Sequence, residues 1–226
     1  MFRLVKLTPP HGWNAVLWEL AIVTLGVLIA LAAQQVVDDF HWRGQVREFR
    51  TALRAEISDD LATYTYRREQ NRCTVARLDE LQRWLDSWRA GRPDKLTGPI
   101  AIPTSLIIRT TVWDSRDPET VSRMPLSEKL DYGSLYTEFA NAEVHRLDER
   151  AAWAALGDYD GATHLDHQDL MRLQGLITRA RLRLRRITTN ADRFIKKAAT
   201  LGIRPVPNPE WPAPDTEICR PILQKG

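Results

Sequence analysis

The sequence NAVLWELAIVTLGVLIALAAQQVVDD, residues 14–39, determines how the rest of the chain is interpreted. Between Ala15 and Val37 the only charged side chain is that of Glu19. A helix of this length would extend about 34 Å at about 1.5 Å per residue, which exceeds the roughly 30 Å hydrocarbon core of a bilayer. Aromatic residues typical of membrane–water interfaces flank both ends: Trp13, Trp18, Phe40 and Trp42. The stretch predicts a membrane-spanning helix over residues 15–37, preceded by a short lead, residues 1–14.

The same stretch also fits a cleaved signal sequence, and the residues leave this alternative open. Arg3 and Lys6 form a basic N-terminal region, and residues 30–32, Ala-Leu-Ala, have the small-x-small form that signal peptidase cleaves. Against cleavage, Glu19 lies inside the apolar run and a helical pattern continues without a break through residues 34–49. An uncleaved anchor is the preferred interpretation.

Glu19 allows two interpretations. It lies about 6 Å from the start of the span by helical rise, so its carboxylate can reach the headgroup region. Alternatively, it belongs to a helix face that continues with Gly26, Ala30 and Ala33, because these residues follow at helical spacing. Gly26 and Ala30 form a small-xxx-small pair, which lets two membrane helices approach closely. This second interpretation predicts a homo-oligomer, or pairing with another membrane protein, through that face.

The basic residues beside the span leave its topology open, because Arg3 and Lys6 precede it and four arginines follow within residues 43–54. The cysteines favour export of the C-terminal part. Only Cys73 and Cys219 are present, and an even pair behind an export-type N-terminus is typical of one disulfide in an oxidising compartment. Such a bond would stabilise the fold by roughly 5 kcal/mol. Two unrelated buried thiols are the alternative. We expect an inner-membrane protein with a periplasmic C-terminal domain.

The rest of the chain is large enough for one domain, which we place at residues 38–202. The net charge is +3 and the isoelectric point about 9.0, with acids and bases interspersed. This mild balance excludes a dedicated nucleic-acid surface. The 13 prolines lie almost entirely outside the periodic segments, so they mark the boundaries of the predicted helices.

Apolar residues at steps of three and four predict that this domain is mainly α. The first pattern continues from the span to residue 88, with a kink near residues 68–73: Phe49, Leu53, Ile57, Leu61, Tyr64, Val75, Leu78, Leu81, Leu85 and Trp88. An extended crossover follows over residues 91–111, and residues 105–115 form either a short helix or a strand. A further helix over residues 127–156 places five residues on one side: Leu130, Tyr136, Phe139, Leu147 and Ala151.

The last helical pattern is the most regular and predicts an antiparallel bundle or coiled-coil seam. Its members are Leu170, Leu173, Ile177, Ala180, Leu184, Ile187, Ala191, Phe194 and Ala198. Gly202 and Pro205 end it. The arginines between them spread around the polar face: Arg179, Arg181, Arg183, Arg185 and Arg186. This spread favours a solvated surface over a site for anionic lipid headgroups or an acidic partner.

The C-terminal tail, residues 203–226, is proline-rich and is expected to be extended. We expect it to form a strap across the bundle, held by a bond from Cys219 to Cys73 and by Trp211.

Signatures of catalysis are missing from the sequence. It contains no glycine-rich phosphate loop, GxSxG, HExxH or CxxC motif, so no enzyme activity and no cofactor are expected. His164 and His167 could place two imidazoles on one helix face for a metal, but two ligands are too few for a protein metal site. Their neighbours Asp166 and Asp169 are better explained as the cap of the last helix.

Three segments resemble small bacterial single-pass membrane proteins of uncharacterised function. They are WELAIVTLGVLIALAAQQVVDDFHW (residues 18–42), RGQVREFRTALRAEISDDLATY (43–64) and VWDSRDPETVSRMPLSEKLDYGSLY (112–136). The resemblance implies a Glu-containing anchor helix followed by a helical extramembrane region, and it implies no activity.

These patterns predict a membrane-anchored envelope protein with a helical interaction or scaffold domain. The alternative is a periplasmic sensor or ligand-binding module without its own output domain. An apolar seam exposed along the bundle would favour the first function, and a ligand-sized pocket between helices, lined by arginines, would favour the second.

Overall fold

The structure of the 226-residue chain is a computed structural model that describes residues 12–104, 107–207, 209, 211 and 217–223. The chain divides into two parts, residues 1–48 and 49–226. It is 76% helical, and the described residues contain no β-strand. The prediction of a mainly α fold is confirmed.

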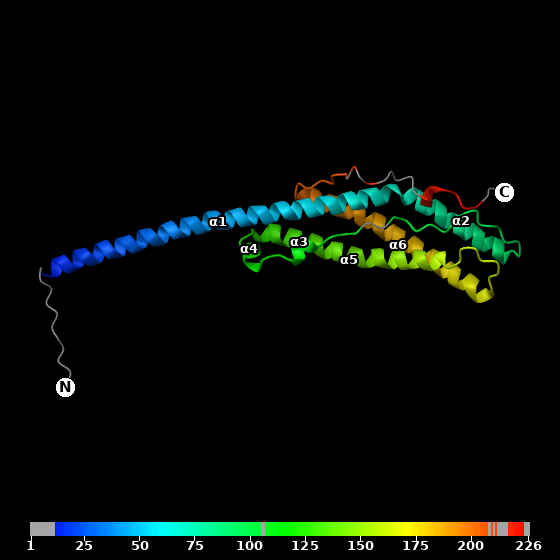
Figure 1. The fold of residues 1–226 in the computed structure, drawn as a ribbon, viewed down its shortest axis with the longest axis horizontal. Coiled ribbons are helices and arrows are strands. Elements are labelled where there is room, and N and C mark those ends of the chain that lie inside the picture. Colours follow the sequence, from blue (N-terminus) through cyan, green and yellow to red (C-terminus); the bar gives the residue numbers. More distant parts are fainter. Residues whose placement is uncertain (1–11, 105–106, 208, 210, 212–216, 224–226) are drawn as a thin grey trace, which may run out of the picture. The chain divides into compact units, whose positions relative to one another are not determined.

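Six α-helices and one 3-10 helix follow one another along the described residues (Figure 1). They are α1 (Trp13–Glu69), α2 (Asn71–Arg89), α3 (Thr111–Asp114), α4 (Pro118–Ser122), α5 (Leu126–Gly157), α6 (His167–Thr200) and η1 (Glu217–Cys219).

The first part contains the beginning of α1, which has no core of its own. Every described side chain from Trp13 to Phe40 is exposed, and the first buried apolar side chain is that of Val46. The helix is long and apolar enough to cross a membrane, and its most apolar stretch is entirely unburied, unlike a core helix of a soluble protein. Length and composition also fit a signal sequence. Residues 1–11 of the predicted lead lie outside the described residues.

The predicted kink lies between α1 and α2, where Gln70 interrupts the helix. Gln70 is fully buried, and its side-chain Nε2 donates a hydrogen bond to Thr104 Oγ1 at 3.1 Å. Its carbonyl oxygen accepts hydrogen bonds from the backbone N–H of Thr74 at 3.0 Å and from the hydroxyl of Thr74 at 3.1 Å. The junction is therefore buried, and both the side-chain amide nitrogen and the backbone carbonyl of Gln70 form hydrogen bonds there.

The connection between α2 and α5 contains two short helices. Of the alternatives for residues 105–115, a short helix is present as α3, and residues 107–110 are irregular. The sequence patterns did not predict α4, although its start carries a recognisable signal. Asp117 precedes Pro118, and the Asp117 carboxylate accepts the backbone N–H of Thr120 at 2.7 Å. This hydrogen bond lowers the pKa of Asp117.

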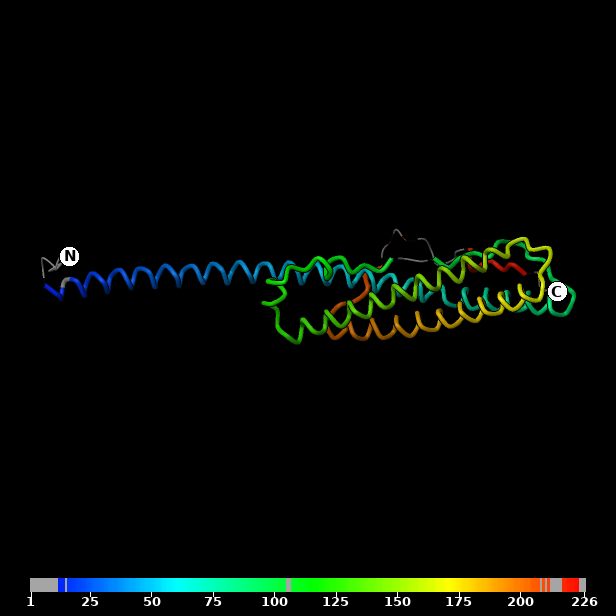
Figure 2. Tube along the Cα trace, turned by 90° about the horizontal axis from the view of Figure 1, so that it is seen from below, coloured from blue at the N-terminus to red at the C-terminus, as the bar shows by residue number. Residues whose placement is uncertain are grey.

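Helices α5 and α6 lie side by side and run in opposite directions (Figures 1 and 2). The predicted seam of α6 is confirmed, because all its members are buried except the half-buried Leu170. The Phe194 ring meets the rings of Phe139 and Tyr64 edge-on, with centroids 5.1 and 4.9 Å away. Gly202 ends α6 with a φ of +66°, a conformation that favours glycine.

The predicted inward face of α5 is wrong in part. Tyr136 and Phe139 are buried as expected, but Leu130, Leu147 and Ala151 are exposed. The apolar side chains that α5 buries are Tyr132, Leu135, Tyr136, Phe139, Ala142, Ala152, Trp153 and Leu156. Helix α5 carries apolar residues on two faces, so steps of three and four from Leu130 follow the outer one. Val75 of α2 was also expected in the core and is exposed.

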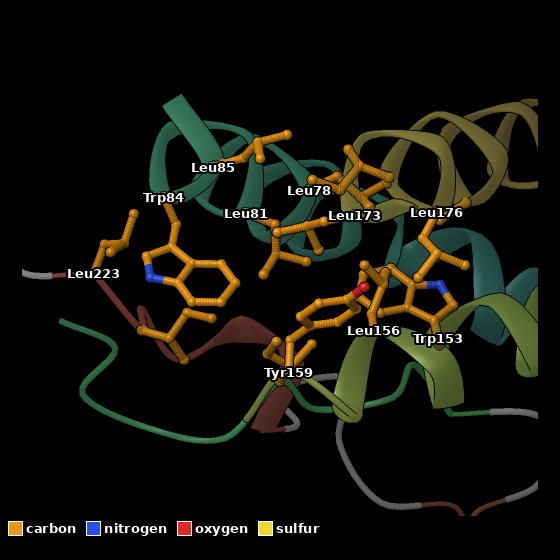
Figure 3. Close-up of a cluster of buried hydrophobic side chains, with 14 of the residues drawn as sticks. Leu78, Leu81, Trp84, Leu85, Trp153, Leu156, Tyr159, Leu173, Leu176 and Leu223 are labelled. Atoms are coloured by element: carbon orange, nitrogen blue, oxygen red, sulfur yellow. The ribbon is translucent and has the colours of Figure 1, made fainter. Parts of the chain in front are cut away.

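A large apolar cluster fills the bundle where α2, α5 and α6 meet, close to the loop between α5 and α6 (Figure 3). Side chains from these helices and from the C-terminal segment point toward one another: Leu78, Leu81, Trp84, Leu85, Trp153, Leu156, Tyr159, Leu173, Leu176 and Leu223. Trp84 and Trp153 are 2% and 0% exposed. Truncating a tryptophan in such a core typically costs about 3–5 kcal/mol.

Candidate functional site

The residues of the predicted anchor interface share one face of α1 and pack against no core. Glu19, Gly26, Ala30 and Ala33 are all exposed. A Cβ atom added at Gly26 would meet no other atom within 4 Å. The face is open, and its contact with another membrane helix stays a prediction.

The two cysteines are joined in the structure, as predicted. The Sγ atoms of Cys73 and Cys219 are 2.13 Å apart, and the bond spans 146 positions of the sequence. It ties η1 to the start of α2. Trp211 meets the Tyr66 ring edge-on at 5.4 Å between centroids. The described portions of the tail are therefore held against α1 and α2, as expected for a strap.

Arg77 of α2 fastens the same C-terminal segment. Its side chain is 1% exposed, and its Nε donates to Glu80 Oε2 at 3.2 Å. Its terminal nitrogens donate to three carbonyl oxygens, that of Pro99 in the connection after α2 and those of Glu217 and Arg220 in the C-terminal segment. Glu80 Oε2 also accepts the backbone N–H of Ile222 at 3.3 Å. Burial lowers the pKa of Arg77, while the Glu80 carboxylate opposes that shift. This buried charge is paired and hydrogen-bonded.

Arg77 belongs to a buried polar stripe that crosses from α1 to α2 and that the apolar patterns did not reveal. Its members recur at steps of four and three: Glu56, Asp60, Thr63, Arg67, Gln70, Thr74 and Arg77. Four of them bond to Pro99, Thr104, Arg109 or Val112, which lie in or at the end of the connection between α2 and α3; the described residues 99–104 and 107–110 of that connection are irregular. Because the backbone of such a segment needs partners, the stripe substitutes for a neighbouring strand. The sequence signal for this stripe was a set of polar residues that recur at the same steps of three and four as the apolar residues of α1 and α2.

Glu56 and Asp60 hold the end of the crossover. Both carboxylate oxygens of Glu56 accept the backbone N–H of Val112, at 3.2 and 3.1 Å, and one accepts the Tyr136 hydroxyl at 2.8 Å. Asp60 Oδ1 accepts the backbone N–H of Arg109 at 3.0 Å, whereas its Oδ2 is buried without a partner. Desolvation, together with the nearby Glu56 charge, raises the pKa of Asp60 to about 8. The Asp60 carboxyl is therefore mostly protonated at neutral pH.

Arg67 and Glu149 form a buried ion pair, with Arg67 Nη2 and Glu149 Oε1 2.7 Å apart. Burial raises the pKa of Glu149, and the Arg67 charge opposes this shift. Beside the pair lies a cavity of about 30 Å³, which Thr63, Thr104 and Arg146 also line. This volume suits one or two water molecules and is too small for a metabolite.

His164 and His167 do not belong to a larger ligand cluster. Both are exposed, and the described residues contain no group of three or more side chains suited to a metal ion. Asp166 Oδ1 accepts the backbone N–H of Asp169 at 2.8 Å, and Asp169 Oδ2 accepts that of Asp166 at 3.2 Å. This capping box at the start of α6 confirms the role predicted for the two aspartates.

An open hollow of about 640 Å³ lies between residues 93–99 and the loop 160–163. Trp84 and Trp88 line it. Trp84 Nε1 donates to the Asp94 carbonyl oxygen at 3.1 Å, while Trp88 Nε1 is shielded from solvent and has no partner among the described residues. The volume lies in the range of small-molecule sites. Sequence patterns could not indicate it, because two separate loops form it.

The outer side of α5 carries exposed apolar residues in two groups, within residues 126–130 and 140–154, which together we call the α5 stripe. Its large members, Leu126, Leu130, Val144 and Leu147, are 67%, 62%, 57% and 52% exposed. The smaller exposed members are Ala140, Ala151 and Ala154. From Ala140 onward the stripe recurs at steps of four and three, the spacing of a helix-packing face. Exposed apolar residues at this spacing favour an interaction site.

No protein-family model, curated protein or solved structure matches this chain significantly. The resemblance to bacterial single-pass membrane proteins therefore stays an expectation from the sequence, and the function is argued from the residues themselves.

Proposed function

We propose that this chain is an envelope protein, anchored in the inner membrane by its N-terminal helix, whose periplasmic helical domain binds a partner protein as a scaffold. It acts by binding, without catalysis and without nucleic acid. The observation that carries the proposal is the α5 stripe, because exposed apolar side chains that recur at helix-packing spacing favour a partner surface.

Two features support the compartment. The beginning of α1 is apolar on all sides and unburied, as a membrane anchor should be. The bond between Cys73 and Cys219 fits an oxidising compartment, since cytosolic thiols are kept reduced.

Photo-crosslinking in native membranes tests the binding function. A photoreactive amino acid at Leu130 or Leu147 should give a protein adduct, because both side chains lie on the α5 stripe. Val75 of α2 is similarly exposed, at 48%, and serves as the matched control position. Adducts of equal yield at all three positions, or none at any, would refute the proposed binding surface.

Maleimide labelling of intact cells tests the location. A reagent that does not cross the inner membrane should label Cys73 and Cys219 only after reduction, because the two thiols are bonded. Labelling that requires lysis but no reductant would place free thiols in the cytoplasm and contradict the periplasmic assignment.

The anchor helix is proposed as a second contact, with a further copy or another membrane protein. Gly26→Leu and Glu19→Leu should weaken cross-linking between anchors in the membrane, because they alter the small-residue face. Val27→Leu places a leucine on a different face and should leave the yield unchanged. Equal yields for all three variants would eliminate this contact.

The hollow beside Trp84 and Trp88 supports a second candidate function, a ligand-binding sensor module. Ligand-observed NMR with a small-fragment library should then find molecules that bind the full-length protein and no longer bind the Trp88→Ala variant. A library without hits at millimolar concentration, or hits that persist in the variant, would argue against this function.

A further inference from the structure

A row of arginines runs along the outer side of α6. Arg172, Arg179, Arg186 and Arg193 are seven residues apart and all exposed. Residues at this interval lie close to one line on a helix, because seven residues make almost two turns. The predicted spread of the arginines around the helix fits Arg181, which pairs with Asp79 of α2, and Arg183, which pairs with Asp148 of α5. Arg179 and Arg186 were predicted to belong to the same spread but lie close to one line.

Most of this row has no internal counter-charge. Arg193 pairs with Glu138 at 3.0 Å. Arg172, Arg179 and Arg186 form no ion pair with any described carboxylate. Their charges are therefore available to another molecule.

The row borders a hollow of about 450 Å³ between α5 and α6. Polar and apolar groups of both helices line it: Glu138, Asn141, Val144 and His145 from α5, and Arg186, Asn190 and Arg193 from α6. Val144 belongs to the α5 stripe, so the apolar surface and the arginine row meet at this hollow. The combined surface is amphipathic, with an apolar side and a basic side.

The charge of this surface is clearly positive. Its basic side chains are Arg172, Arg179, Arg183, Arg186, Arg193 and Lys197. Its acids are Glu138 and Asp148, and both are already paired with members of that set. The unpaired charges select for an acidic molecule and against a basic one.

We propose that the α5–α6 surface binds a helix of a partner protein that carries an apolar face edged by acidic residues. This inference rests on the proposed function and names the partner class of the same surface. The apolar residues of the helix would pack on Val144 and Leu147, and its carboxylates would pair with Arg179 and Arg186. Grooves between helices bind amphipathic helices in this way.

The positive charge of the surface and the regular spacing of its apolar residues favour an acidic amphipathic helix over other binding partners. A second copy of this chain would present the same positive surface, so two such surfaces repel each other. An anionic lipid surface would attract the arginines and accept apolar side chains, but it does not require the regular steps of four and three at which the apolar residues recur along α5. A helix matches both the charge and the spacing.

Charge reversal combined with cross-linking tests the proposal in the full-length protein in its native membrane. With a photoreactive residue at Val144, the double variant Arg179→Glu/Arg186→Glu should reduce the adduct at least about tenfold, because each reversal opposes an acidic partner. Arg185→Glu is the matched control, since Arg185 is an exposed arginine on another side of α6 without an ion pair among the described residues. The control should keep the yield, and unchanged melting temperatures should confirm that all variants fold.

The other outcomes separate this inference from the proposed function. Mass spectrometry of the adduct should identify a helical segment with acidic residues beside apolar ones. An adduct with a second copy, or one insensitive to charge reversal, would overturn the acidic-helix inference while leaving a binding role for the α5 stripe. Flotation with anionic phosphatidylglycerol vesicles that the double variant abolishes, without any protein adduct, would overturn both.

Discussion

The outer face of α5 and the inner face of α1 and α2 distribute side chains in opposite ways. On α5, Leu130 and Leu147 point to solvent, while on α1 and α2 the charged Asp60, Arg67 and Arg77 are buried. Burying charged side chains is unfavourable unless they have partners. The polar stripe has its partners inside the molecule, in the crossover, α5 and the C-terminal segment. The large side chains of the α5 stripe stay mostly exposed, and the partner proposed for them comes from outside the chain.

The largest expected effect on stability comes from replacing Arg77 in the buried polar stripe. Arg77→Ala should lower the free energy of unfolding by about 3–5 kcal/mol, because it leaves the buried Glu80 carboxylate and three carbonyl oxygens without their donor. Urea denaturation measures the loss. Arg83→Ala on the exposed side of α2 should change stability by less than about 0.5 kcal/mol. Equal effects would mean that Arg77 does not fasten the strap.

The second prediction concerns the buried ion pair of Arg67 and Glu149, which tests whether a buried charge is tolerated only when it is paired. Arg67→Met should cost about 3 kcal/mol or more, because the Glu149 carboxylate would stay buried and unpaired. The double variant Arg67→Met/Glu149→Leu should recover most of that loss, since no isolated charge is left. A double variant as unstable as the single one, by urea denaturation, would show that packing rather than charge dominates at this position.

The third prediction concerns Asp60, whose burial makes the stability of the protein depend on pH. Between about pH 4 and pH 8 folded Asp60 keeps a proton that the unfolded chain releases, so raising the pH favours unfolding. Below that window both states are protonated, and above it both are ionised. Asp60→Asn removes this titration. Its stability relative to the natural chain should therefore rise by about 1 kcal/mol per pH unit through the window.

Urea denaturation at a series of pH values between 4 and 9 measures that difference. Asp86→Asn is the control, because Asp86 lies away from Asp60 on α2 and its side chain is 56% exposed. The Asp86 variant should show no comparable change relative to the natural chain across the series. A flat difference for Asp60→Asn would show that the buried carboxyl is already ionised at low pH.

The smallest expected effect on stability concerns the α5 stripe. Leu147→Gln should change the free energy of unfolding by less than about 0.5 kcal/mol, because this side chain is half-exposed. Leu135→Gln on the same helix should cost about 3 kcal/mol or more, since Leu135 is fully buried. Calorimetry of both variants measures this contrast. A large loss for Leu147→Gln would mean that the stripe is internal packing.

The sequence predicts the long helices well, because long apolar repeats report which residues are helical. The α6 seam was predictable residue by residue, since that helix has a single apolar face. In α5 the same reasoning failed for Leu130, Leu147 and Ala151, because two apolar faces compete and periodicity does not say which faces inward. The short α4 was missed, since five residues are too few for a repeat.

The site was less predictable than the fold. Disulfide pairing followed from the two cysteines alone, and the cap of α6 from Asp166 and Asp169. The buried polar stripe depends on contacts with segments distant in sequence, such as that between Asp60 and Arg109. The hollow beside Trp88 depends on the meeting of two loops. Such features arise from tertiary packing, which local patterns do not encode.

The bond between Cys73 and Cys219 also sets how the chain responds to mechanical load. It removes 146 residue steps, or about 500 Å of extended chain, from the covalent path between the two ends. A force applied between those ends can lengthen only the residues before Cys73 and after Cys219. Even when its helices are pulled apart, residues 73–219 therefore stay closed in a loop, and the distance between the two ends stays short.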